Sequence, residues 1–136
     1  MAPLVEILGT GIDLVENARI AASIEKFGDR FLRRIFTEDE IAYCAAYPNP
    51  VPHYAARFAA KEAVSKAFGT GIGKALGWKE IEVWRNEVGA PFIRLLAGGL
   101  ELANQRGVTQ IHVSLTHTDA YAAANALLVG GGRNST

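Results

Sequence analysis

The chain has 136 residues, of which 49% are hydrophobic and 21% charged, and its formal net charge is zero. This length and balance are those of one soluble globular domain with its own hydrophobic core. The lack of a basic excess argues against a general nucleic-acid or membrane-surface binder. The single cysteine, Cys44, excludes an intrachain disulfide and a cysteine-rich zinc site.

We expect a cytoplasmic protein that has no contact with a membrane. The N-terminal apolar segment contains Glu6 and has no basic leader, so it does not have the pattern of a secretory signal. The apolar stretch 120–129 is interrupted by Asn125 and is too short to span a bilayer. A lone cysteine is also compatible with a reducing compartment.

The first elements are a strand and a helix. Residues 4–14 are rich in apolar and β-branched residues with interspersed glycine, which predicts a buried strand that ends near Asp13. Asn17 is a plausible cap for a helix that carries Ile20, Ile24 and Phe27 at helical spacing. Gly28 is expected to end or bend that helix.

Two more helices follow around a proline-rich loop. Thr37 and Glu40 have the spacing of a capping box, which predicts a helix from Glu38 to about Tyr47. The prolines of 48–52 then predict a loop. Residues 53–68 contain neither glycine nor proline and are rich in alanine, so they predict the most secure helix of the chain.

Shorter signals alternate after the glycines at 69, 71 and 73, which should terminate that helix. We expect one α+β domain over residues 1–130, followed by a polar tail at 131–136. The expected elements are strand 81–85, a turn at 86–89, its hairpin partner 91–96, helix 100–106, and strands 109–115 and 121–129.

Asp13, Glu62 and Lys66 are the candidate chemical groups. Two carboxylates and an ammonium suit a Mg²⁺ ion that shares its ligands with substrate phosphates. The simpler interpretation is that Glu62 pairs with Lys66 one turn away on a helix surface, and that Asp13 is a turn residue or cap. Each residue taken singly favours the simpler interpretation.

Other motifs carry weaker signals. Gly69 and Gly71 can let backbone amides approach a phosphate, although glycine after a helix is most often a stop. The two histidines that flank Ser114 do not make a hydrolase site, because no nucleophile elbow surrounds that serine. A modest basic face in residues 19–34 is either a solvated helix surface or a dock for an acidic protein. Its bases are Arg19, Lys26, Arg30, Arg33 and Arg34.

Taken together, the motifs resemble those of the holo-acyl-carrier-protein synthases, the small bacterial phosphopantetheinyl transferases. The resemblance spans nearly the whole chain and preserves the order of the motifs. It rests on GTGID at 9–13, IFTEDE at 35–40, RFAAKEAVSKA at 57–67, FGTGIG at 68–73, GAPF at 89–92 and HVSLTHT at 112–118.

This resemblance implies a fold in which a mainly antiparallel sheet packs against a long central helix. It also implies a reaction of fatty acid biosynthesis, in which 4'-phosphopantetheine moves from coenzyme A to a serine of apo acyl carrier protein and adenosine 3',5'-bisphosphate leaves. The family is typically a trimer with the coenzyme between subunits.

The resemblance further assigns roles to individual residues. Asp13 and Glu62 are expected to hold Mg²⁺ and, with Lys66, to form the catalytic set. The base is Glu62 or a bound water, and the sequence does not separate these two. The basic face, represented by Arg19, Lys26 and Arg30, is expected to bind the carrier protein. The expected coenzyme-binding residues are Arg57, Lys61, Lys66, Gly69, Gly71, Pro91 and His117.

Two other classes of function stay open at this point. One is a noncatalytic subunit that keeps the fold and only binds an acyl carrier protein. The other is a different magnesium-dependent enzyme that acts on nucleotide phosphates, since the same site chemistry would serve it.

Overall fold

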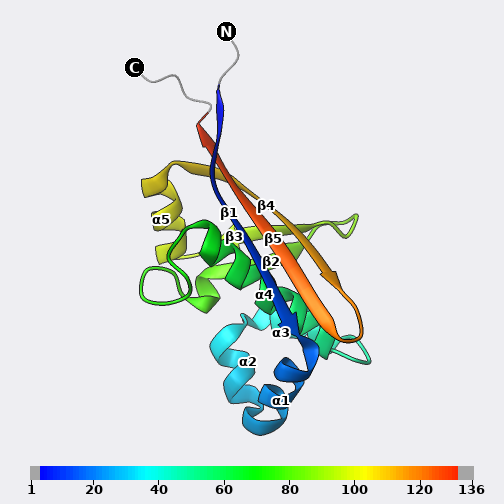
Figure 1. Ribbon diagram of the computed structural model, residues 1–136. Helices are drawn as coiled ribbons and strands as arrows, with labels where there is room; N and C mark the ends of the chain where they lie inside the picture. The colour runs from blue at the N-terminus through cyan, green and yellow to red at the C-terminus, as the bar shows by residue number, and fades with distance from the viewer. Residues whose placement is uncertain (1–3, 132–136) are drawn as a thin grey trace.

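The computed structural model describes residues 4–131 of the protein (Figure 1). Four helices follow the first strand, the other strands come in two consecutive pairs separated by one helix, and all strand pairs are antiparallel. The elements are β1 (Val5–Glu16), α1 (Asn17–Phe27), α2 (Asp29–Ile35), α3 (Glu38–Ala45), α4 (Val51–Ala67), a 3-10 turn (Trp78–Glu80), β2 (Ile81–Arg85), β3 (Pro91–Leu95), α5 (Gly98–Arg106), β4 (Val108–His117) and β5 (Tyr121–Gly131).

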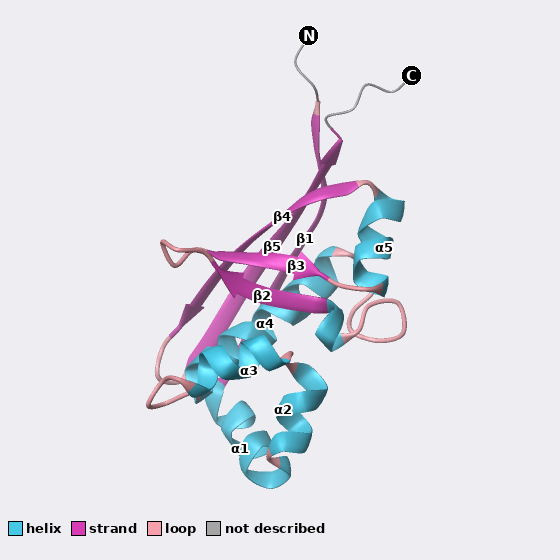
Figure 2. Cartoon of the chain, turned by 180° about the vertical axis from the view of Figure 1, so that it is seen from behind, coloured by secondary structure: helices cyan, strands magenta, loops and turns pink. Residues whose placement is uncertain are grey.

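The long strands form one sheet in the order β1-β5-β4, and β2 and β3 form a separate hairpin. Helix α4 packs along one face of the long sheet, as Figures 1 and 2 show. Alternate residues of β5 are buried under the helix, because successive side chains of a strand point to opposite faces. The expected α+β fold, with an antiparallel sheet on a long central helix, is confirmed.

Two glycines of β1 allow α4 to lie unusually close to the sheet. A Cβ atom on Gly9 would lie 2.0 Å from the carbonyl oxygen of Ala67, and one on Gly11 would lie 1.9 Å from that of Ala63. No larger residue fits at either position without a shift of the backbone. This close approach brings the strand residue Asp13 to the side of α4 that carries Lys66.

The other face of the long sheet is uncovered in the single chain. Ile12 and Leu14 of β1 are 70% and 65% exposed, and Tyr121 of β5 is exposed as well. The expectation of a buried first strand that ends near Asp13 is therefore wrong. β1 continues to Glu16 and is shielded mainly on its α4 side, so its apolar residues do not all enter one core.

Several other expectations about local structure need correction. α4 begins at Val51 rather than at 53, because proline is tolerated in the first turn of a helix, where its missing N–H has no intrahelical partner. α3 ends at Ala45. Asn17 is not the cap of α1 but its first residue. Its buried amide instead donates to the carbonyls of Thr118 and Asp119, which ties α1 to the β4–β5 turn.

The expected capping box of α3, the glycine end of α1 and the β2–β3 hairpin are confirmed. β5 reaches Gly131, one residue beyond the expected domain end, and the rest of the predicted tail, 132–136, lies outside the described residues. Within residues 4–131, no helix combines the length and the apolar character that crossing a membrane requires.

Candidate active site

Asp13, Glu62 and Lys66 lie together where β1 crosses α4. The Lys66 ammonium is 2.9 Å from the Asp13 carboxylate and also donates to the carbonyl of Ile12 at 3.1 Å. Lys66 thus forms an ion pair with Asp13 on the strand, and within residues 4–131 no ion pair joins it to Glu62 on its own helix. The Asp13 side chain is 14% exposed and that of Lys66 is 51% exposed, so the pair stands at the surface and is open to a ligand.

Glu62 shares the electrostatic environment of this pair. Partial burial raises the pKa of Glu62, the nearby Asp13 carboxylate raises it further, and Lys66 opposes both effects. A carboxylate whose charge raises the pKa of its neighbour marks a place where a cation is favourable. Their oxygens are the ligands that Mg²⁺ prefers, so the residues present fit such an ion. No group of three or more His, Cys, Asp or Glu residues gathers as a metal site within residues 4–131.

A cavity of about 590 Å³ lies beside Lys66. Its walls come from β1 and β5 and include Thr10, Gly11 and Asn125, but neither Asp13 nor Glu62 lines it. Of the three candidate residues, Lys66 lines this cavity, while Asp13 and Glu62 lie outside its wall.

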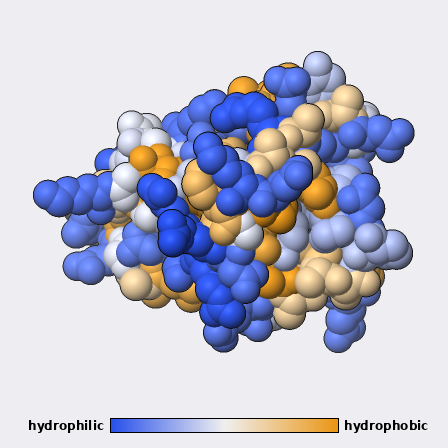
Figure 3. Space-filling view, turned by 90° about the horizontal axis from the view of Figure 1, so that it is seen from below, coloured by the Kyte–Doolittle hydropathy of each residue, from blue (hydrophilic) through white to orange (hydrophobic). Residues whose placement is uncertain are grey.

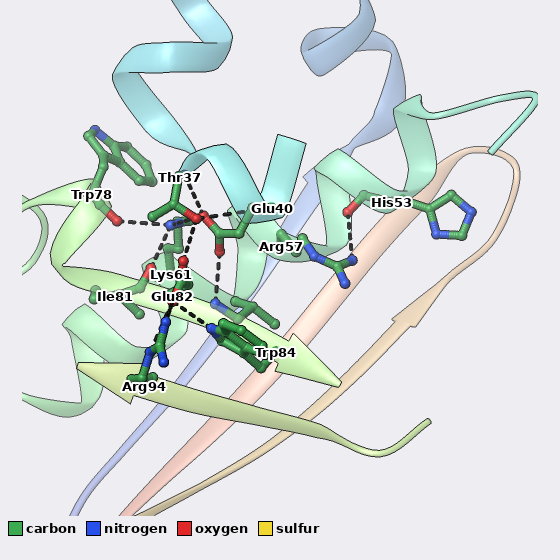
Figure 4. Close-up of polar contacts among 11 residues, drawn as sticks. Thr37, Glu40, His53, Arg57, Lys61, Trp78, Ile81, Glu82, Trp84 and Arg94 are labelled. Carbon is green, nitrogen blue, oxygen red and sulfur yellow. Dashed lines mark hydrogen bonds and ion pairs between the residues drawn. The ribbon is translucent and has the colours of Figure 1, made fainter. Parts of the chain in front are cut away.

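Lys61 does not face this cluster. Its side chain is fully buried, and the ammonium lies 2.7 Å from the Glu40 carboxylate and 2.9 Å from the carbonyl of Trp78 (Figure 4). A third bond goes to the carbonyl of Ile81. Burial lowers the pKa of Lys61, and the Glu40 carboxylate opposes that change. Because all three donors have partners in the core, the expected coenzyme-binding role of Lys61 is not supported.

The hydrogen-bond network of Lys61 and Glu40 extends to the β2–β3 hairpin. Glu82 of β2 accepts hydrogen bonds from Thr37 at 2.6 Å and from Arg94 at 2.8 Å, and also from Trp84 (Figure 4). Burial alone would raise the pKa of Glu82, but these hydrogen bonds and the Arg94 charge lower it below its usual range. The hairpin is thus fixed to the start of α3 by charge-assisted hydrogen bonds.

Arg57 and His117 lie at a second place, Arg57 in the N-terminal half of α4 and His117 at the end of β4. Arg57 is buried, with its guanidinium 4.0 Å from the centre of the Tyr43 ring. His117 ends β4, is exposed, and has its ring centre 5.3 Å from that of His53. These two residues, both expected to bind the coenzyme, therefore lie in one region. Within the single chain this region is separate from the Asp13–Lys66 pair.

Gly69 and Gly71 both adopt positive φ angles, 79° and 64°, and close the end of α4. The Gly69 N–H donates to the carbonyl of Lys66 and the Gly71 N–H to that of Ser65. Because both amides already bond to the helix, this geometry does not support the expectation that they hold a phosphate. Pro91 is the first residue of β3, opposite Arg85, and is half-buried.

The predicted basic face spans α1 and α2, where Arg19, Lys26 and Arg30 are all exposed. Arg30 and Arg34 border a cavity of about 270 Å³ that Phe27 and Phe31 also line. Figure 3 shows the molecule from below, where hydrophilic residues surround smaller hydrophobic areas. This surface thus combines positive charge with accessible aromatic rings.

No pattern in the sequence points to the buried partners Glu40 and Glu82 or to the ring of His53. The capping box predicted only the local role of Glu40, and its long-range bond to Lys61 has no sequence signal. Tyr43 in the last turn of α3 and Tyr47 just after it are four residues apart in the sequence, a spacing that could have indicated an aromatic cluster near the start of α4.

Comparisons with known proteins agree with this architecture. Residues 9–126 match the family model of the 4'-phosphopantetheinyl transferase superfamily. The holo-[acyl-carrier-protein] synthase of Koribacter versatilis is 48% identical over 122 residues, which are 90% of this chain and 98% of the relative. That of Serratia proteamaculans is 48% identical over 124 residues, or 91% and 98% of the two chains.

Solved structures of this kind also superpose on the chain. The crystal structure of the Neisseria meningitidis holo-[acyl-carrier-protein] synthase gives a TM-score of 0.85 at 31% identity, covering 90% of this chain and 98% of the other. The Helicobacter pylori synthase in complex with coenzyme A gives 0.79 at 32% identity, covering 88% and 98%. The chain belongs to the 4'-phosphopantetheinyl transferase superfamily.

Proposed function

We propose that this protein transfers 4'-phosphopantetheine from coenzyme A to a serine of apo acyl carrier protein, as a holo-acyl-carrier-protein synthase. The observation that carries the proposal is the convergence of Asp13, Glu62 and Lys66 at the crossing of β1 and α4. Similarity over nine-tenths of the chain to synthases of that name, one of them solved with coenzyme A, supports the choice of substrates.

The reaction breaks the phosphoanhydride bond of coenzyme A and forms a phosphate ester to the carrier serine. The serine oxygen forms a bond to the phosphorus that bears pantetheine, and the bond from that phosphorus to the bridging oxygen breaks. Adenosine 3',5'-bisphosphate leaves with the electron pair, and the serine loses its proton. Glu62, whose pKa is raised by burial and by Asp13, is suited to take that proton directly or through a water molecule.

Lys66 neutralises negative charge, and Asp13 holds the Lys66 side chain in position. The Lys66 ammonium, half-exposed and held by Asp13, is placed to balance negative charge on the leaving phosphate. When bound by Asp13 and Glu62, Mg²⁺ would supply charge neutralisation for the diphosphate. The ion pair between Lys66 and Asp13 keeps the ammonium beside the carboxylates without a bound ligand.

The carrier protein is expected to bind the face formed by α1 and α2. Arg19, Lys26 and Arg30 offer positive charge to an acidic partner, and the cavity beside Phe27 and Phe31 offers apolar contact. Charge of this kind mainly increases the rate of encounter and the specificity of docking. Replacing Arg19 by Glu should weaken carrier affinity without changing coenzyme A affinity.

A homotrimer would explain two features of the single chain. The apolar outer face of the long sheet, with Ile12 and Leu14, has no cover. Arg57 and His117 lie away from Lys66, so a coenzyme that touches both regions would do so between neighbouring subunits. We infer that three chains pack through this face and complete the site. The mass of the protein in solution, measured by light scattering, tests this inference.

Mass spectrometry of an apo acyl carrier protein incubated with coenzyme A, Mg²⁺ and this protein tests the main proposal. The expected result is a carrier that gains one phosphopantetheine group at its serine, together with release of adenosine 3',5'-bisphosphate. Binding of the carrier without any gain in mass would instead indicate a noncatalytic subunit. Cleavage of a nucleotide phosphate without transfer would indicate a different magnesium enzyme.

A further inference from the structure

Asn17 stands at the junction between β1 and α1 and is buried, with only 5% of its surface exposed. Its side-chain NH2 group donates to the carbonyl of Thr118 at 2.8 Å and to that of Asp119 at 3.1 Å. Its backbone N–H donates to the carbonyl of Ala120 at 2.9 Å. One residue thus holds three consecutive carbonyls of the turn between β4 and β5, beside which α1 leaves the sheet (Figure 1).

The turn that receives these bonds is itself firmly held. The Thr118 hydroxyl accepts hydrogen bonds from the N–H groups of Ala120 at 3.3 Å and Tyr121 at 3.0 Å, and the Thr118 N–H donates to the carbonyl of Tyr121 at 2.7 Å. β5, which begins in this turn, is the central strand of the long sheet and packs against α4. The turn therefore belongs to the same packed unit as Glu62 and Lys66 of α4.

Helix α1 has few other anchors on that unit. Of its 11 residues, only Asn17 and Ile20 are buried, and Glu16 at the N-cap makes no side-chain capping bond. Ile24 is only partly buried against the core. Apolar contacts have no preferred direction, whereas a hydrogen bond requires alignment of donor and acceptor. The direction in which α1 leaves the sheet therefore depends on Asn17 more than on Ile20.

The unpaired oxygen of Asn17 also indicates a role in orientation rather than in stability. The Oδ1 atom is buried and has no hydrogen-bond partner within residues 4–131, which costs free energy. A leucine side chain, which has the same branched shape, would bury no such atom. Thr118 and Asp119 are exposed, so their carbonyls could bind water in its place. What only the amide provides is a directed link between α1 and the turn.

We propose that Asn17 is a positioning residue for the transfer reaction, which fixes the direction of α1 and thereby aligns a carrier protein docked on this helix with Asp13 and Glu62. This inference rests on the proposed function, because that function supplies the carrier protein and its docking face. Asn17 is buried and acts only through the orientation of α1.

The length of α1 amplifies any change at its first residue. At 1.5 Å per residue its 11 residues span about 16 Å, so a swing of about 10° at Asn17 moves the far end by about 3 Å. Lys26 of the carrier-binding face lies near that end. A misplacement of about 1 Å between reacting groups can lower a rate about a hundredfold. Loss of the Asn17 anchor should therefore slow transfer, although the surface that the carrier contacts is unchanged.

Two variants of α1 separate orientation from stability. Asn17→Leu keeps the branched shape of the side chain and removes both of its hydrogen bonds. Ile20→Val, the matched control, shortens the other buried side chain of the helix by one methylene and keeps those bonds. Residual dipolar couplings of backbone N–H groups, measured by NMR, give the angle between α1 and α4. We expect this angle to change in Asn17→Leu and not in Ile20→Val, and an unchanged angle in Asn17→Leu would overturn the proposal.

Single-turnover kinetics links the angle to the reaction. With coenzyme A, Mg²⁺ and apo carrier protein all saturating, the rate constant of transfer should fall about tenfold or more in Asn17→Leu. It should stay close to the wild-type value in Ile20→Val. Calorimetry with coenzyme A, and with a carrier whose acceptor serine is replaced by alanine, should give wild-type affinities for both variants. A variant that loses carrier affinity but transfers at the wild-type rate once saturated would contradict the inference, because Asn17 would then shape the docking face itself.

If Asn17→Leu does not fold, Asn17→Gln takes its place, because it keeps the amide and lengthens the side chain by one methylene. The same loss of rate is expected, and an unchanged rate rejects the positioning role. A wild-type protein that modifies the carrier, with an Asn17→Leu variant that behaves like Ile20→Val, keeps the proposed function and loses the inference. A wild-type protein that binds both substrates and transfers nothing loses both.

Discussion

The ammonium of Lys61 lies 2.7 Å from the carboxylate of Glu40, and neither side chain is exposed to solvent. The next residue in the sequence, Glu62, is half-buried and responds instead to Asp13. These two adjacent residues of α4 thus have different roles. Lys61 belongs to the core, and Glu62 belongs to the candidate site. The buried pair fixes α4 against α3 and β2 and thereby sets the orientation in which Glu62 is presented.

Lys61→Met should destabilise the protein by about 3–5 kcal/mol, because it leaves the Glu40 charge buried without its partner. Chemical denaturation measures this loss. The double variant Glu40→Leu with Lys61→Met should lose less than the sum of the two single changes, since no charge stays unpaired. Lys79→Met, at an exposed lysine, should change stability by less than about 0.5 kcal/mol. Strict additivity of the two core changes would contradict this account.

Gly11→Ala should destabilise the protein and separate Asp13 from Lys66. The added methyl carbon would lie 1.9 Å from the carbonyl oxygen of Ala63, so β1 or α4 must shift. We expect a loss of about 1–3 kcal/mol in unfolding free energy, with a larger proportional loss of transfer activity. The matched control is Gly73→Ala, where an added Cβ meets nothing within 4 Å. Similar stability of the two variants would show that close packing at Gly11 is unimportant.

Much of this architecture could be predicted from local patterns. The capping box of Thr37 and Glu40, the glycine stop after α1 and the hairpin turn before β3 are decided by neighbouring residues, and each is confirmed. The expected start of α4 at residue 53 is wrong because proline, which breaks a helix interior, is accepted in the first turn.

Long-range relationships were less accessible. The burial of Lys61 depends on Glu40, 21 positions earlier, and no periodicity encodes that pair. Apolar content predicts a fully buried β1, and the prediction fails because composition alone does not tell which face of the strand is covered. The family resemblance predicts that Asp13 and Lys66 lie close together, as the structure shows. The physical cause is the close packing of α4 on the glycines of β1, which only the structure reveals.

Asp13→Asn and Glu62→Gln should each abolish or greatly reduce transfer while the fold persists. The Lys66 side chain of the Asp13–Lys66 ion pair is 51% exposed, so solvent screens the attraction. Loss of this ion pair should therefore cost no more than about 1 kcal/mol of stability. Each variant should also lose measurable Mg²⁺ binding in a calorimetric titration, because each removes one carboxylate. Glu101→Gln, at an exposed acid of α5, should retain both properties. Normal turnover in either site variant would refute the assigned roles.

Asp13→Asn should also lower the pKa of Glu62. Burial is the larger cause of its raised pKa and stays in place, but the Asp13 charge is removed. The pKa should therefore move toward the usual value near 4.3 without reaching it. NMR titration of the Glu62 side-chain carboxyl carbon in metal-free protein measures the change. A rise of the pKa in this variant would mean that Asp13 acts on Glu62 through structure rather than charge.

Cys44 should be unreactive in the folded protein. Its side chain is fully buried, and burial raises the pKa of the thiol to about 12, so almost no thiolate exists near neutral pH. A colorimetric thiol reagent at pH 7.5 should modify it only as fast as the protein opens. Denaturant should increase the rate in parallel with unfolding measured by circular dichroism. Rapid modification without denaturant would show that α3 separates from α4 in the native state.

His53 should make the ligand-free protein less stable in mild acid. Its pKa in the folded protein is below the usual value near 6.5, so between those two values the unfolded chain binds more protons. The free energy of unfolding must then fall as pH falls through this window, and His53→Phe should remove that part of the loss. Glu62, with its raised pKa, contributes in the opposite direction in both proteins and cancels in the comparison. Chemical denaturation at pH 8 and pH 5.5 provides the measurement, and an equal loss in both proteins would place the acid sensitivity elsewhere.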